Sequence, residues 1–103
     1  MGKIIAGSIK DFKAGTISKV TVDGREIAIA NIDGTLHAFD DSCTHAGASL
    51  AEGHLEGCTV VCGWHGAVFD CTTGRLAKFP AKIRDLGSYP VHIKDQQVYI
   101  EVS

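Results

Sequence analysis

The chain has 103 residues and a formal net charge of −2, with 45% hydrophobic and 21% charged residues. This length is typical of one domain, and the composition is that of a folded chain rather than a disordered one. A slightly acidic balance argues against a protein that binds nucleic acid, which would normally be basic. No apolar run approaches the roughly 20 residues needed to cross a bilayer, and the first residues lack the apolar core of a secretory signal. We therefore expect a cytoplasmic protein without a membrane span.

Short β-branched runs separated by turn residues predict antiparallel strands in the first forty residues. Ile4-Ile5 is expected to form an edge strand. Two Asp-Gly pairs, at 23–24 and 33–34, then separate three alternating runs. The runs are residues 19–22, 26–32 and 35–39. Asp-Gly is a strong hairpin signal because a type I′ turn needs positive φ at both central residues, so the runs predict a meander.

The middle of the chain, from about residue 41 to 80, differs from both ends. It holds all four cysteines, the single tryptophan and half of the glycines. Short strands are expected here at 54–56, 58–61 and 67–70. We find no convincing helix in the chain, since residues 8–13 and 46–50 could each form a turn or two at most. Some forty loop-rich residues need something other than apolar burial to order them.

The C-terminal end repeats the pattern of the N-terminal end. Residues 90–94 and 97–102 predict two strands joined by a polar turn at Asp95-Gln96, and the second strand alternates apolar and polar residues. The sequence therefore predicts an all-β fold in one domain over residues 1–103. A small antiparallel sandwich or barrel would form the base, and a loop-rich insert of about residues 41–80 would interrupt it. The base would comprise residues 1–40 and 81–103.

Two short pairs of possible metal ligands stand out within the insert. They are Cys43-Thr44-His45 and Cys62-Gly63-Trp64-His65, with sixteen residues between them. Each pair places one sulfur and one imidazole on a tight loop. Three interpretations compete: unrelated thiols and histidines, a tetrahedral zinc site, or a 2Fe–2S cluster with both sulfurs on one iron and both imidazoles on the other. Zinc modules usually group cysteines with cysteines and histidines with histidines, which favours the cluster.

The two boxes, their order and their separation resemble those of the Rieske family, and the similarity to small bacterial Rieske-type ferredoxins covers nearly the whole chain. It extends to Ala48-Ser49-Leu50, Phe69-Asp70 and Thr73-Gly74. The resemblance implies the Rieske fold, with the insert as its cluster-binding subdomain and the segment around Phe79-Pro80-Ala81 covering one side of the cluster. It implies cluster ligands at four positions. Cys43 and Cys62 would bind the buried iron, and His45 and His65 the outer iron.

The ligand set and its surroundings predict the reduction potential. Two thiolates and two neutral imidazoles leave the oxidised cluster about neutral, so two-His clusters accept an electron at roughly −150 to +300 mV, against roughly −400 mV for plant-type clusters. High-potential relatives carry a disulfide between the ligand loops, but the matching positions here are Ala48 and Trp64. Their serine and tyrosine hydroxyl donors are replaced by Ala67 and Phe69. We therefore expect the low end of the range.

The resemblance implies electron transport, not an enzyme on its own. The protein would be the ferredoxin component of a bacterial ring-hydroxylating dioxygenase system in aromatic hydrocarbon catabolism. It would pass one electron from an NAD(P)H-dependent flavoprotein reductase to a terminal oxygenase, as a cytoplasmic monomer. Two alternatives stay open: a Rieske subunit of another redox system, such as a diiron monooxygenase or a nitrite reductase, and a zinc-stabilised binding module.

Several side chains outside the ligand set receive simpler interpretations. Cys58 and Cys71 are expected to be small buried or inert thiols, with a disulfide between them less expected. Trp64 either packs over the insert or forms an apolar docking surface beside the outer iron. The acidic residues Asp40, Asp41, Glu52 and Glu56 flank the boxes and would form a solvated face or steer a redox partner. The other histidines are expected to face solvent or form local hydrogen bonds: His37, His54 and His92.

Overall fold

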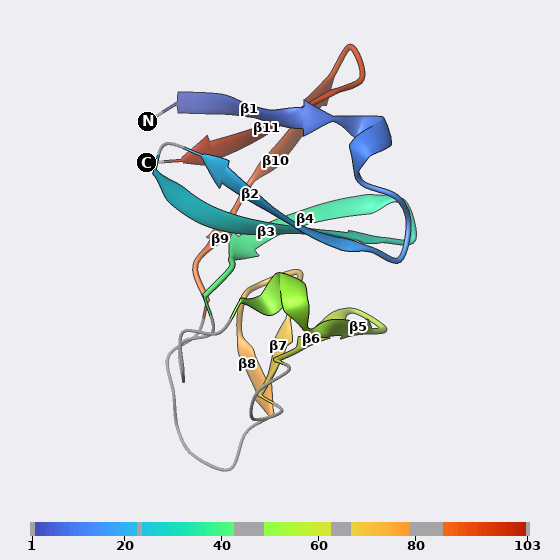
Figure 1. The fold of residues 1–103 in the computed structure, drawn as a ribbon, viewed down its shortest axis with the longest axis vertical. Helices are drawn as coiled ribbons and strands as arrows, with labels where there is room; N and C mark the ends of the chain where they lie inside the picture. The colour runs from blue at the N-terminus through green and yellow to red at the C-terminus, as the bar shows by residue number, and fades with distance from the viewer. Residues whose placement is uncertain (1, 23, 43–48, 63–66, 79–85, 103) are drawn as a thin grey trace.

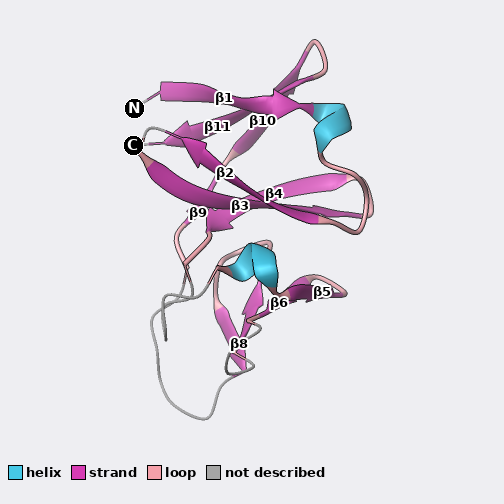
Figure 2. Ribbon diagram, in the orientation of Figure 1, coloured by secondary structure: helices cyan, strands magenta, loops and turns pink. Residues whose placement is uncertain are grey.

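The computed structural model describes residues 2–22, 24–42, 49–62, 67–78 and 86–102. Within these residues the protein consists of eleven strands and two short 3-10 helices (Figure 1, Figure 2). The strands are β1 (Gly2–Ser8), β2 (Ile17–Val22), β3 (Arg25–Ile32), β4 (Thr35–Asp40), β5 (His54–Glu56), β6 (Thr59–Val61), β7 (Val68–Asp70), β8 (Leu76–Lys78), β9 (Ser88–Tyr89), β10 (Val91–Lys94) and β11 (Gln97–Val102). The helices are η1 (Ile9–Asp11) and η2 (Leu50–Glu52). The predicted all-β class is confirmed, and neither described helix is long and apolar enough to span a membrane.

The strands pair into three antiparallel sheets. Their orders are β1-β11-β10, β2-β3-β4-β9 and β5-β6-β7-β8. In Figure 1 the first two sheets form the upper part of the molecule, and the third sheet lies below them with η2. The second sheet therefore packs against the first sheet on one face and against the third sheet on the other.

Strand β3 shows how the layers are held together. Ile27 and Ile29 belong to the core shared with the first sheet, which includes Val98 and Ile100 of β11. The intervening Ala28 and Ala30 belong to the core shared with the third sheet. Successive side chains of a strand point to opposite faces, so one apolar run buries both faces of β3.

The predicted hairpin turns are visible in the backbone angles. Asp33 and Gly34 have φ values of 53° and 89°, as a type I′ turn requires, and the turn joins β3 to β4. Asp95 and Gln96 adopt the same left-handed conformation without glycine, with φ values of 51° and 65°. At the first predicted turn, Gly24 has a φ of 76°, whereas Asp23 lies outside the described residues.

The structure confirms the predicted edge strand, the meander, the C-terminal hairpin and the three short strands of the middle region. Two strands were missed, β8 and β9, which have three and two residues. Among the described residues, one short helical turn, η2, lies at Leu50–Glu52 and overlaps the end of the range 46–50, of which 46–48 lie outside the described residues. A long-range contact sets its position, because Asp41 accepts the Leu50 N–H through its carbonyl (2.7 Å) and the Ala51 N–H through its carboxylate (3.0 Å).

Candidate metal centre

Cys62 is the one predicted ligand that lies within the described residues. It follows β6 directly, is 2% exposed, and has no disulfide partner within the described part of the chain. Its N–H donates to the Ala67 carbonyl (2.8 Å), which brings the two ends of segment 63–66 together. A buried sulfur in an apolar core can become a thiolate only beside a compensating positive charge, and a metal ion provides one.

The other predicted ligands, Cys43, His45 and His65, lie outside the described residues, as do Trp64 and 79–85. The residues that flank the first ligand box are described, however. Ser42 and Ser49 form an isolated antiparallel bridge, so the ends of segment 43–48 are also adjacent. The described residues on either side of segments 43–48 and 63–66 are therefore paired through their backbones.

The flanks of these segments meet in one buried cluster of side chains. This cluster contains Leu50, Cys62, Ala67 and Leu86. Leu50 follows the first box, Cys62 begins the second box and Ala67 follows it, and Leu86 follows segment 79–85. Leu86 is held there by its N–H, which donates to the Gly74 carbonyl (2.7 Å). The described residues therefore gather the anchor points of both ligand boxes against the second sheet.

Asp40 and Asp41 fix the chain where it leaves β4. The Asp40 carboxylate accepts hydrogen bonds from the Gly87 N–H (2.9 Å) and from the Tyr89 hydroxyl, and so joins the outgoing chain to the returning one. A Cβ on Gly87 would lie 2.8 Å from this carboxylate, so a larger residue there would push the Asp40 side chain away from its hydrogen bonds. Burial, and then the bond to Asp40, raise the pKa of Tyr89. Asp41 is 2% exposed, so the expected solvated face is wrong for this residue; its capping of η2 explains its burial.

The remaining cysteines differ from each other. Both are free, but Cys58 is exposed and Cys71 is buried. The expected burial is confirmed for Cys71 and is wrong for Cys58. Desolvation, and then the negative charges of Asp70 and Cys58, raise the pKa of Cys71 to about 12. Neither a lone exposed thiol nor a protonated buried one is a metal site.

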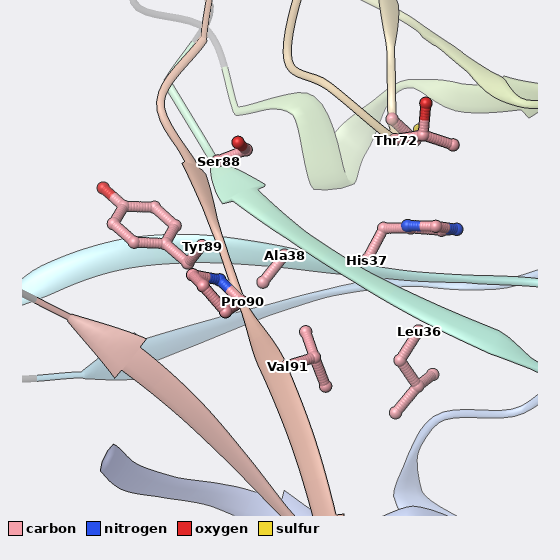
Figure 3. Close-up of a pocket in the computed structure, with 9 residues that line it drawn as sticks. Leu36, His37, Ala38, Thr72, Ser88, Tyr89, Pro90 and Val91 are labelled. Atoms are coloured by element: carbon pink, nitrogen blue, oxygen red, sulfur yellow. The ribbon is translucent and has the colours of Figure 1, made fainter. Parts of the chain in front are cut away.

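The remaining histidines have local roles. His54 lies 2.9 Å from the Glu56 carboxylate and His92 lies 3.2 Å from the Glu101 carboxylate, which confirms the expected local hydrogen bonds. His37 lines a cavity of about 410 Å³ between β4, the β9–β10 segment and the turn after β7. In Figure 3 its ring lies below Thr72. Among the described residues, no group of three or more His, Cys, Asp or Glu side chains could hold a metal ion, in this cavity or elsewhere.

Comparison with known proteins identifies the family. The Rieske [2Fe-2S] domain family matches residues 2–90. The chain is 35% identical to the ferredoxin component of the naphthalene 1,2-dioxygenase system of Pseudomonas putida, over 97% of this chain and 95% of that protein. It is 38% identical to the ferredoxin subunit of 3-phenylpropionate/cinnamic acid dioxygenase of Photorhabdus laumondii, over 100% and 97% of the two chains.

Solved structures agree with the sequence relatives. A ferredoxin of Sphingomonas yanoikuyae B1 superposes with a TM-score of 0.91 at 32% identity, covering 99% of this chain and 100% of that one. A chain from a complex of reduced oxygenase and oxidised ferredoxin in carbazole 1,9a-dioxygenase superposes with a TM-score of 0.87 at 33% identity, covering 95% and 100%. The predicted Rieske fold is therefore confirmed.

The described residues fit the cofactor that this family implies. Cys62 offers a soft sulfur donor shielded from water, at the end of a strand and among apolar side chains. Beside the other box, the Ser49 hydroxyl oxygen is buried without a hydrogen-bond partner among the described residues, so a group bound there could satisfy it. A cluster held between the two boxes could bind to the buried thiol at the second box. It could also satisfy the buried hydroxyl beside the first box. The chain belongs to the Rieske [2Fe-2S] domain family, and its cofactor is a Rieske-type 2Fe–2S cluster.

Proposed function

We propose that this protein is a one-electron carrier, the ferredoxin component of a ring-hydroxylating dioxygenase system. The observation that carries the proposal is the match to ferredoxin components of such systems along nearly the whole of both chains. These relatives are electron-carrying components of larger systems, and the same role makes this chain a carrier rather than an enzyme. The zinc-module alternative loses its support, because the family that matches the chain binds iron and sulfide.

The ligands are proposed residue by residue. Cys43 and Cys62 would bind one iron, and His45 and His65 the other. Support comes from the C-x-H and C-x-x-H spacing and from the described flanks, which bring the ends of each box together. The bound cluster supplies the capacity to take up and release one electron. We also propose that residues 41–80 form the cluster-binding part and that residues 1–40 and 81–103 form the base.

The surroundings of Cys62 support a potential at the low end of the Rieske range. Ala67 pairs with Cys62 across the hairpin, and Phe69 lies two residues further along the same face; both are fully buried. Neither has a hydroxyl that could donate to sulfur and stabilise the negative charge of the reduced state. A low potential suits delivery to an oxygenase and does not suit oxidation of a quinol.

The partners are proposed from the relatives. The carbazole 1,9a-dioxygenase structure holds an oxygenase and a ferredoxin together, so this chain would deliver its electron to a terminal oxygenase. A component named ferredoxin within such a system implies a reductase upstream, which we propose is an NAD(P)H-dependent flavoprotein. The protein would work as a monomer in the cytoplasm.

A reductive titration of the purified protein tests this function. We expect iron and acid-labile sulfide, visible colour, and an EPR signal after reduction, with a midpoint potential near −150 mV. We also expect the reduced protein to be reoxidised on mixing with a ring-hydroxylating terminal oxygenase. A colourless protein that contains zinc, or a potential well above 0 mV, would overturn the proposal.

A further inference from the structure

The β6–β7 hairpin carries two thiols at the end remote from its predicted ligands. Thr59 pairs with Asp70 in this hairpin, so the next pair outward places Cys58 opposite Cys71. The Cys71 N–H donates to the Cys58 carbonyl (2.9 Å), which continues the ladder by one step. Residues opposite each other in this way have Cα atoms about 5.5 Å apart, within the range of about 4.4–6.8 Å that a disulfide spans.

The side chains of this pair also face the same way. Opposite residues of an antiparallel ladder project to the same side of the sheet, and the charge of Cys58 contributes to the electrostatic environment of Cys71. The register therefore places the two residues opposite each other, and both thiols are free. The register brings them together from turns thirteen residues apart in the sequence.

Small molecules can approach the pair. Cys58 is exposed and lines a cavity of about 500 Å³ between the β5–β6 turn and the loops of the base, while Cys71 lines the cavity shown in Figure 3. Because Cys58 is accessible and Cys71 is buried, an oxidant would react first at Cys58.

The pair is separate from the proposed ligands. Cys58 and Cys62 are four residues apart along an extended strand, which corresponds to about 13 Å. Cys62 lies at the ligand end of the hairpin, and the thiol pair lies at its other end. A bond between Cys58 and Cys71 would enclose the second ligand box within one covalent loop without using any ligand.

We propose that Cys58 and Cys71 form a modification site, a dithiol that a low-molecular-weight disulfide oxidises to a cross-strand disulfide. The Cys58 thiolate attacks one sulfur of the reagent, forms a mixed disulfide and releases one thiol. The Cys71 sulfur then attacks the Cys58 sulfur and gives up its proton, and the second reagent thiol leaves. The protein loses two electrons and two protons, and the reagent gains both.

The test uses the cluster-loaded protein and mixtures of oxidised and reduced glutathione under argon. Free thiols are blocked with N-ethylmaleimide after equilibration, and peptides are mapped by mass spectrometry, while visible absorbance reports the cluster. We expect a peptide cross-linked between Cys58 and Cys71 whose yield rises with the proportion of oxidised glutathione. The absorbance should stay unchanged, and dithiothreitol should reverse the cross-link.

Two variants identify the order of attack. In Cys71→Ala, Cys58 should accumulate as the glutathione mixed disulfide; in Cys58→Ser, Cys71 should remain a free thiol. The proposal is overturned if wild-type protein stops at the mixed disulfide or keeps both thiols free at every ratio. It is equally overturned if the cross-link forms only after the visible absorbance is lost.

Discussion

The two sides of β3 face cores of different chemistry. Toward the first sheet, the core is made of large aliphatic and aromatic side chains, such as Ile27, Ile29 and Ile100, on strands of six to eight residues. Toward the third sheet, β3 contributes Ala28, Ala30 and the partly buried Ile32. Large side chains such as Phe39 and Phe69 complete this core, and the opposing strands have three residues each. That second core also contains two buried thiols, Cys62 and Cys71.

The two cores suggest that the base and the insert are stabilised in different ways. A buried Ile contributes about 1.5–3 kcal/mol of hydrophobic stabilisation, whereas Ala contributes much less, so Ile27 and Ile29 bind β3 more strongly to the first sheet than Ala28 and Ala30 bind it to the third. The three-residue strands of the third sheet form short ladders, which offset less of the entropy of ordering the insert. We infer that metal–ligand bonds supply the remainder, so that cluster binding and order of the insert are coupled.

Removing Cys62, the proposed ligand that lies within the described residues, should have the largest effect. In Cys62→Ala we expect iron to fall to background and the amides of β5–β8 to exchange with solvent rapidly. The amides of β1 and β11 should keep their protection, because the core that these strands share contains no proposed ligand. Iron analysis and amide hydrogen exchange measure the two effects.

The matched control is Cys58→Ala, the same substitution at an exposed thiol four residues earlier. This variant should keep its iron and the protection of the insert. The coupling is refuted if Cys62→Ala retains a coloured, redox-active centre, or if the base loses its protection together with the insert.

A smaller effect is expected from restoring a hydroxyl beside Cys62. In Ala67→Ser, the new hydroxyl would lie opposite Cys62 and could donate to its sulfur, most strongly when the centre carries the extra electron. A differential hydrogen bond of about 1–2 kcal/mol corresponds to a rise of about 40–80 mV for one electron. A reductive titration measures the shift.

Val68→Thr provides the control for this change. Val68 is adjacent in β7, points to the other face of the sheet and is only half-buried, so a hydroxyl there should leave the potential unchanged. Equal shifts in both variants would show that the hydroxyl acts through general polarity. No shift in Ala67→Ser would place its side chain out of reach of the sulfur.

The sequence predicts a region well when residues close together in the chain determine its structure. The turn at Asp33-Gly34 was predictable because two residues encode its backbone angles. The ligand boxes were recognisable for the same reason, since each box is a contiguous motif. The ligand geometry stays a prediction, because three of the four ligands lie outside the described residues.

What sequence reasoning missed depends on contacts between distant segments. Strand β9 is a strand only because Tyr89 and Ser88 pair with the edge of β4. The burial of Asp41 follows from the amides of η2 that it caps, and no local pattern distinguishes it from Asp40. The juxtaposition of Cys58 and Cys71 is likewise a product of the β6–β7 register, which spacing alone does not reveal.

The smallest expected effect concerns how a turn of the insert is held. The turn at Asp33-Gly34 rests on backbone conformation, whereas the turn after β7 uses a charge. The N–H and hydroxyl of Thr72 both donate to one Asp70 carboxylate oxygen, at 2.8 Å and 2.6 Å. The Thr72 hydroxyl is the largest cause of the lowered pKa of Asp70, followed by the Thr72 N–H. Because the folded pKa lies below the unfolded one, this contact stabilises above about pH 4 and is lost as pH falls through the folded pKa.

Thr72→Val should therefore raise the pKa of Asp70 toward its ordinary value and lower stability near pH 7 by about 0.5–1 kcal/mol. The deficit relative to wild type should shrink as pH falls from 7 toward 3. Thr59→Val is the control, because the Thr59 hydroxyl donates to the Glu56 carbonyl at the same distance, 2.6 Å, and that acceptor does not titrate. The loss of stability in Thr59→Val should therefore be the same at every pH in this range. Carboxyl-carbon NMR titration of Asp70 and thermal unfolding between pH 7 and pH 3 distinguish the two variants. If the loss of stability in both variants had the same pH dependence, the charge of Asp70 would add nothing to the turn. The two hydroxyl hydrogen bonds would then contribute equally, whether the acceptor is a carboxylate or a carbonyl.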